Sequence, residues 1–138
     1  MEPRLLDLGP LGRALDSLDL ALRLHGASRG GADEAALLRD GVIQRFEYGF
    51  ELTWKQLRRF LELFGLERVD QLTNRELFRL GFEQGLLDDA DAWMLFLRHR
   101  NLTSHIYDEA MAQSVFSSAR PFLDAARRLL QRMRERST

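Results

Sequence analysis

Arginine, histidine and small polar residues are concentrated in one short run, Arg98 to Tyr107, with the sequence RHRNLTSHIY. Phosphoryl transfer needs a cation that neutralises phosphate oxygens and a group that moves a proton near neutral pH. A guanidinium supplies the first and an imidazole the second. Arg100 and His105 are therefore the candidate catalytic pair, with Asn101 beside them as a positioning hydrogen-bond donor.

The spacing of this pair makes a structural demand. On an unbroken α-helix five positions turn the side chain by about 500°, so Arg100 and His105 would point about 140° apart. Either the helix breaks between them or two chains share the site. Thr103 and Ser104 favour a break because they compete for backbone hydrogen bonds, and Asp108 can then cap the next helix. The structural alternative is a histidine at a helix end and an arginine in a surface ion pair.

A second polar set, Glu47, Glu51 and Lys55, recurs every four residues opposite an apolar helical stripe. One interpretation is a polar wall that orients Arg100 or His105. The other is an exposed, ion-paired helix face worth a few tenths of a kcal/mol.

Apolar residues at helical spacing predict an all-α protein, an antiparallel up-down bundle of about five helices. We expect one domain over residues 1–138, with about 1–8 and 134–138 frayed. The first two expected helices run from after Pro10 to His25 and from Asp33 to Phe64. The third runs from a capping box at Thr73 and Glu76 to Gly85, and the fourth from a cap at Asp88 into the motif. The last begins at about Glu109, with a kink or restart at Pro121.

Four residues within these helices carry further expectations. Gly41 and Gly49 interrupt the long second helix at about 1 kcal/mol each relative to alanine, which favours close approach of another helix or a local bend. Trp54 and Trp93 are most simply core anchors rather than base-stacking platforms.

Composition bounds the function further. The chain has 138 residues, a formal net charge of −1 and no cysteine, so a thiolate metal site and disulfides are excluded. No metal site is expected, because the three histidines are not clustered with carboxylates at ligand spacing. Without a leader segment or a long apolar run we expect a cytoplasmic protein with no membrane contact.

Global charge gives no indication of nucleic-acid binding. Arginines crowding the C-terminus could form a local basic surface or simply complement a helix dipole: Arg127, Arg128, Arg132, Arg134 and Arg136.

Two separated motifs carry a resemblance to a known family. The run 100–109, RNLTSHIYDE, has the pattern R-x4-H-x-Y, and it agrees in order and spacing with IQRFEY at 43–48 and FELTWK at 50–55. Together they resemble the HEPN superfamily, and more narrowly the nucleotidyltransferase substrate-binding proteins, over about residues 11–130. The sequence departs from the family at Gly49, where a hydroxyl residue is commoner, and at Pro121; neither lies in the motif.

The resemblance implies a HEPN partner of a minimal nucleotidyltransferase, of the toxin-antitoxin type, acting as a metal-independent endoribonuclease without a cofactor. Arg100 and His105 would be catalytic. Tyr107 would be the residue that the nucleotidyltransferase adenylylates or contacts, which would silence RNA cleavage. A homodimer would bring two motifs to one cleft. It would so overcome the divergence of the Arg100 and His105 side chains within one helix.

Two other interpretations stay open. The same cleft could present a nucleotide or another substrate to the nucleotidyltransferase without cleaving anything, as a non-catalytic subunit. The chain could also be a purely structural dimerising bundle. Nucleotidyltransferase catalysis itself is not expected here, because no G-S motif is followed by paired aspartates in a strand context.

Overall fold

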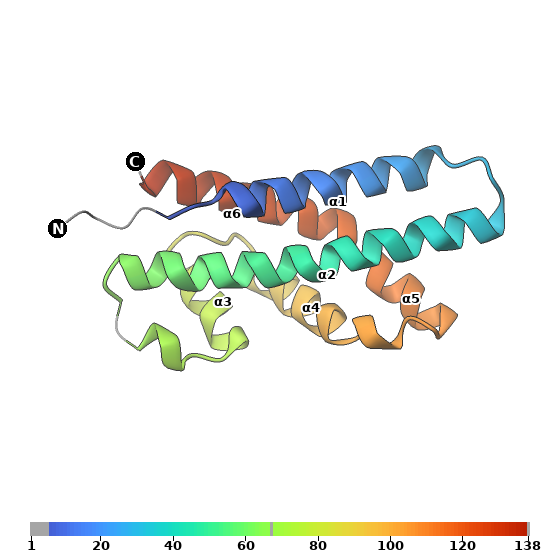
Figure 1. Ribbon diagram of the computed structural model, residues 1–138. Coiled ribbons are helices and arrows are strands. Elements are labelled where there is room, and N and C mark those ends of the chain that lie inside the picture. Colours follow the sequence, from blue (N-terminus) through green and yellow to red (C-terminus); the bar gives the residue numbers. More distant parts are fainter. Residues whose placement is uncertain (1–5, 67, 138) are drawn as a thin grey trace.

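The structure is a computed structural model that describes residues 6–66 and 68–137. Within these ranges the chain forms six α-helices and two 3₁₀ turns and no strand, which confirms the all-α class (Figure 1). The elements are α1 (Gly9–Ala27), α2 (Ala32–Leu63), η1 (Val69–Gln71), α3 (Asn74–Glu83), α4 (Ala90–Asn101), η2 (Thr103–His105), α5 (Glu109–Phe116) and α6 (Ala119–Ser137).

Helix α2 is the spine of the bundle. It has 32 residues, about 48 Å at 1.5 Å per residue. Helices α1 and α6 pack along one side of it, and α3 and α4 lie along the other (Figure 1). The start of α1 and the end of α6 lie at the same end of the bundle, whereas the α4–α5 junction lies toward the opposite end.

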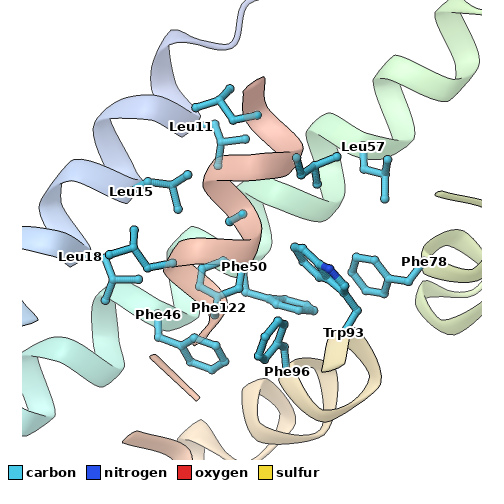
Figure 2. Packing of buried hydrophobic residues seen from close by; sticks show 14 of the residues in the cluster. Leu11, Leu15, Leu18, Phe46, Phe50, Leu57, Phe78, Trp93, Phe96 and Phe122 are labelled. Carbon is cyan, nitrogen blue, oxygen red and sulfur yellow. The ribbon is translucent and has the colours of Figure 1, made fainter. Parts of the chain in front are cut away.

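An aromatic core fixes α4 against this spine (Figure 2). The Phe122 ring of α6 meets Phe46 edge-on at 5.2 Å, Trp93 at 5.9 Å and Phe96 at 5.7 Å between centroids. Trp93 is 2% exposed and stacks on Phe78 at 5.2 Å, so its predicted anchoring role is confirmed. Each such side chain contributes about 1.5–3 kcal/mol by burial. Trp93 and Phe96 therefore anchor α4 in the core just before the motif begins.

The two glycines of α2 behave differently. A Cβ on Gly49 would lie 3.5 Å from the Phe122 ring and 4.0 Å from Leu15, so α6 and α1 both approach closely there, as expected. A Cβ on Gly41 would have, among the described residues, only the Arg45 side chain within 4 Å, at 3.8 Å, so no close approach of another helix is found there.

Local signals set most helix ends. The Thr73–Glu76 capping box is formed in both directions, and Gly65 and Gly85 each adopt a φ of 76° where α2 and α3 end. Pro121 lies in the first turn of α6, a restart rather than a kink, because proline lacks only an amide hydrogen that the first turn does not use.

Three expectations on local structure were wrong or incomplete. Asp89, not Asp88, caps α4, accepting from the Ala92 amide at 3.1 Å. Asp88 instead pairs with Arg128 and Arg132 of α6. Helix α1 continues past Gly26 to Ala27. Trp54 is half-buried, with its indole N–H used in a hydrogen bond rather than sealed in the core.

The ends of the chain bear on two further expectations. Residues 1–5 and 138 lie outside the described residues, while residues 134–137 belong to α6. Across the part of the chain that is described, no helix combines the length and apolar character that a membrane crossing would require.

Candidate functional site

The motif lies where α4 ends. Helix α4 stops at Asn101, and Thr103 to His105 form the 3₁₀ turn η2. The chain then starts α5 at Glu109, with Asp108 as the cap, its carboxylate accepting from the Met111 amide at 3.0 Å. The predicted break between Arg100 and His105 and the predicted cap are both confirmed.

Arg100, in the last turn of α4, points back to α2. Its guanidinium forms an ion pair with the Glu51 carboxylate, and both side chains are about one-third exposed. The other Glu51 oxygen accepts from the Trp54 indole N–H at 3.0 Å. Arg100 Nε is buried and has no hydrogen-bond partner among the described residues. Glu51 and Trp54 therefore fix the direction of the guanidinium, while part of its donor capacity stays unused.

Glu47, one turn earlier on α2, reaches the turn itself. The Thr103 hydroxyl lies 2.9 Å from the Glu47 carboxylate and 2.9 Å from the Arg100 carbonyl oxygen. Because Thr103 is buried, this contact pins η2 to α2 immediately before the histidine. Glu47 and Glu51 thus hold the two sides of the helix break.

Lys55 continues the same row but not the same contacts. Its Nζ lies 5.9 Å from the Trp54 ring centroid, and among the described interactions none joins Lys55 to the motif. The first two members of the predicted row meet the motif and the third does not.

His105 and Tyr107 face outward. His105 is exposed, and its ring lies 6.2 Å from that of Tyr107 in an edge-on arrangement. Tyr107 is 86% exposed, which rules out a core tyrosine bonded to a backbone carbonyl. No contact joins the side chains of Arg100 and His105 among the described interactions.

His99 is the third imidazole near this junction. Its Nδ1 lies 2.5 Å from the Ser118 hydroxyl, which ties α4 to the connection between α5 and α6. Burial, with a smaller contribution from the positive charge of Arg98, lowers the pKa of His99 below its ordinary value. The neutral ring is therefore favoured in the fold, and its role here is structural.

A buried arginine holds the start of α5. Arg39 of α2 is 8% exposed, and its guanidinium donates to both carboxylate oxygens of Glu109 at 2.7 and 2.6 Å. The hydrogen bonds from Arg39, followed by its charge, lower the pKa of the Glu109 carboxyl. Sequence spacing did not reveal this pair, because the partners are 70 positions apart.

Two clefts flank the motif. One of about 490 Å³ lies between the first turn of α3 and the last turns of α4; its lining is Arg75, Met94, Leu97, Arg98, Asn101 and Leu102. The other, of about 430 Å³, follows α2 to η2; its lining is Leu37, Asp40, Gly41, Ile43, Gln44, Glu47, Thr103 and Ile106. Of the predicted site residues, Asn101 belongs to the first cleft and Glu47 to the second.

The pairing of Arg75 with Arg98 was not predicted from the sequence. Arg98 was part of the motif run, but nothing in the spacing linked it to an isolated arginine in a short helix 23 positions earlier. Among the described residues there is no group of three or more histidine, aspartate or glutamate side chains placed to hold a metal ion.

Comparison with known proteins places these features in context. A family model described as nucleotidyltransferase substrate binding protein like matches residues 6–135. A Haemophilus influenzae protein named "Probable ribonuclease HepT" is 30% identical over 99 residues, covering 70% of this chain and 68% of that protein.

Two solved structures are similar as well. A Haemophilus influenzae structure, described as revealing the fold of a substrate binding domain of a nucleotidyltransferase, matches with a TM-score of 0.86 and 27% identity, covering 93% of this chain and 99% of the other. A protein from Thermus thermophilus matches with a TM-score of 0.70 and 32% identity over 88% of this chain and 98% of the other.

Proposed function

The chain belongs to the family of nucleotidyltransferase substrate binding protein like proteins, and we propose that it is the helical partner of a minimal nucleotidyltransferase with an endoribonuclease site built on Arg100 and His105. The relative named as a probable ribonuclease supports this proposal. The proposed chemistry needs no metal ion, since an imidazole and a guanidinium supply the proton transfer and the charge.

The observation that carries the proposal is the break after Asn101. It leaves the His105 imidazole at an exposed turn, while Glu51 and Trp54 hold Arg100 on the preceding helix. A histidine used for proton transfer must be reachable by substrate, and a charge-stabilising arginine must be preorganised. Both conditions are met within one short stretch of chain.

In the proposed reaction His105 takes the proton of a ribose 2′-hydroxyl. The 2′-oxygen then forms a bond to the adjacent phosphorus, and the bond from phosphorus to the 5′-oxygen breaks. The products are a 2′,3′-cyclic phosphate and a 5′-hydroxyl, whose proton comes from a second imidazole. Arg100 stabilises the negative charge that builds on the phosphate oxygens, and Asn101 positions the phosphate.

The second imidazole would come from a second copy of the chain. One His105 cannot easily act as both base and acid, and within one chain its side chain does not contact Arg100 among the described interactions. A twofold pairing of motifs would supply both groups in one cleft. Support comes from the apolar surface beside the motif, where Leu37 is 73% exposed and lines the cleft that ends at Ile106.

Tyr107 would be the control point. Its phenol is exposed beside His105 and immediately before the α5 cap, where a partner enzyme can reach it. The phenol oxygen would attack the α-phosphate of ATP, releasing pyrophosphate and leaving AMP joined through a phosphodiester. The added bulk and negative charge beside the phosphate site would exclude RNA.

The decisive experiment compares wild type with His105→Ala on single-stranded RNA in the presence of EDTA. We expect wild type to cleave, leaving 2′,3′-cyclic ends, and the variant to be slower by about 100- to 10,000-fold. His25→Ala is the matched control, since the described contact of His25 is with Phe116 and not with the motif, so its cleavage rate should equal wild type. Cleavage that survives in His105→Ala, or disappears with EDTA, contradicts the assignment.

A second candidate function rests on the same ion pair. The Glu51 carboxylate already uses part of the hydrogen-bonding capacity of the Arg100 guanidinium. The remaining donors could bind a nucleotide phosphate for a partner nucleotidyltransferase without any cleavage. The similar structure described as a substrate binding domain favours this alternative. Nucleotide binding that depends on Arg100, in a protein that never cleaves RNA, would select it.

A further inference from the structure

The cleft between α3 and α4 carries charge that the fold does not use. Its lining holds two guanidiniums, Arg75 and Arg98, and no carboxylate. Both side chains are exposed, and neither makes a hydrogen bond or ion pair within the described part of the chain. Two unpaired cations on one concave surface repel each other and attract an anion.

The rest of the lining is apolar. Met94, Leu97 and Leu102 are partly buried against the core and form the remaining wall together with the Asn101 amide. Such a surface offers a flat ring an apolar contact, and the amide can donate to and accept from a ring edge. The cleft volume of about 490 Å³ lies in the range of small-molecule sites. A ligand with a phosphate and an aromatic ring satisfies both halves of the lining.

The cleft lies next to the motif along the chain, although neither Arg100 nor His105 lines it. Asn101 is the residue after Arg100, and Leu102 is the N-cap of the turn that carries His105. A strand whose phosphate is attacked at Arg100 and His105 would pass the end of α4, and one of its nearby nucleotides could reach this lining.

We propose that the cleft formed by Arg75, Arg98, Met94 and Leu97 is a subsite for one nucleotide of a single-stranded RNA, adjacent to the phosphate that is cleaved. Arg75 and Arg98 hold the backbone phosphate of that nucleotide, and its base lies against Met94 and Leu97. This inference rests on the proposed function, since it takes RNA as the ligand. It adds a subsite to which α3 contributes Arg75, a residue outside the motif.

The test measures binding without cleavage. The probe is a labelled single-stranded oligonucleotide with 2′-O-methyl ribose throughout, which lacks the attacking hydroxyl. Affinity is measured against salt concentration for wild type, for Arg75→Gln with Arg98→Gln, and for the control Arg23→Gln. Arg23 is an exposed arginine of α1, the helix that packs on the opposite side of α2 from α3 and α4. Glutamine keeps a long polar side chain at each position, so the fold should be unaffected.

We expect the double variant to bind about 10- to 100-fold more weakly. The slope of log affinity against log salt should become shallower by about 0.7, the value for one phosphate contact on a single strand. Arg23→Gln should retain both the affinity and the slope of wild type. An oligonucleotide with abasic positions should bind wild type more weakly at unchanged slope, because the base contact carries no charge.

The outcomes separate the subsite from the catalysis. Wild type that cleaves ordinary RNA while the double variant binds the probe with unchanged affinity and slope overturns the subsite and leaves the proposed function standing. Wild type that never cleaves, with binding lost in the double variant, supports the cleft as a site for single-stranded RNA but removes the ribonuclease and with it the placement beside a cleaved phosphate. Wild type that does not bind the probe overturns both.

Discussion

Two arginine-rich regions of this chain use the same side chain in opposite ways. Along α6, arginines bond to neighbouring elements: Arg127 to Asp16 and Asp19, Arg128 to Asp88, Arg132 to Asp88 and the Leu86 carbonyl, and Arg136 to the Gln84 and Gly85 carbonyls. At the end of α4, within the described part of the chain, Arg98 has no such partner and Arg100 has one, Glu51.

The difference separates charge that holds the fold from charge that remains available to a ligand. The crowded C-terminus is the more basic stretch of sequence, yet most of its arginines are satisfied inside the molecule. The expectation that they merely complement a helix dipole was too weak, because they link α6 to α1 and to the α3–α4 connection. Arginine density alone therefore does not distinguish arginines that hold the fold from those whose donors stay unused.

The largest expected effect tests this contrast directly. Arg100→Ala should lower RNA cleavage by about 100- to 1,000-fold, the usual loss when one charge-stabilising donor is removed. The free energy of unfolding should change by less than about 1 kcal/mol, since the Glu51 pair is partly solvated. Arg128→Ala is the control and should cleave as wild type does. If Arg100→Ala leaves cleavage and partner affinity unchanged, the motif is structural.

The second-largest effect concerns an arginine that holds the fold, so stability should decrease while activity stays the same. Arg132→Ala removes a 2.7 Å ion pair to Asp88 and a 3.1 Å hydrogen bond to the Leu86 carbonyl. Because the ion pair is partly exposed, we expect a loss of about 1 kcal/mol and a decrease in Tm of about 4 °C. Cleavage per folded molecule should stay constant. Calorimetry with an activity assay measures both, and lost activity at full stability would contradict the division of roles.

A smaller effect concerns His99, which joins α4 to the α5–α6 connection through Ser118. Because burial lowers the pKa of His99, the unfolded chain takes up a proton before the folded one as pH falls. The contribution of His99 to stability should be fully present above the ordinary histidine pKa of about 6.5 and decrease as pH falls below it. His99→Gln should flatten that part of a plot of Tm against pH. Parallel plots for wild type and variant would show that His99 does not contribute.

The smallest effect on stability is expected at Tyr107. The side chain is 86% exposed, so Tyr107→Phe should change the free energy of unfolding by less than about 0.5 kcal/mol. After incubation with the partner nucleotidyltransferase and ATP, wild type should gain the mass of AMP and the variant should not. Mass spectrometry decides, and an adduct of equal yield on the variant would exclude Tyr107 as the acceptor.

Local signals allowed most of the fold to be predicted. Thr73 with Glu76, Gly65, Gly85 and Asp108 act over three or four residues, so each helix end follows from its own neighbours. Asp88 and Asp89 show where this stops. Either aspartate could cap α4 by its position, but Asp88 pairs with Arg128 and Arg132, about 40 positions away, and Asp89 is the cap.

The candidate site was predictable only in part for the same reason. The four-residue spacing of Glu47 and Glu51 predicted that both lie on one face of α2. It did not predict which motif residue each of them would contact. The break after Asn101 followed from Thr103 and Ser104. Arg39 with Glu109, and Arg75 with Arg98, are brought together by tertiary packing alone and left no signal in the sequence.

The turn η2 has a consequence for local opening of the backbone. The amides of α4 lie in a helix that Trp93 and Phe96 anchor in the core, so their exchange with deuterium requires a large part of the bundle to open. The His105 amide is held only by a 3.0 Å bond to the Leu102 carbonyl at an exposed turn, and it can exchange by a much smaller opening. The backbone that follows Thr103, on the histidine side of the motif, can therefore open locally, while the arginine side keeps its position.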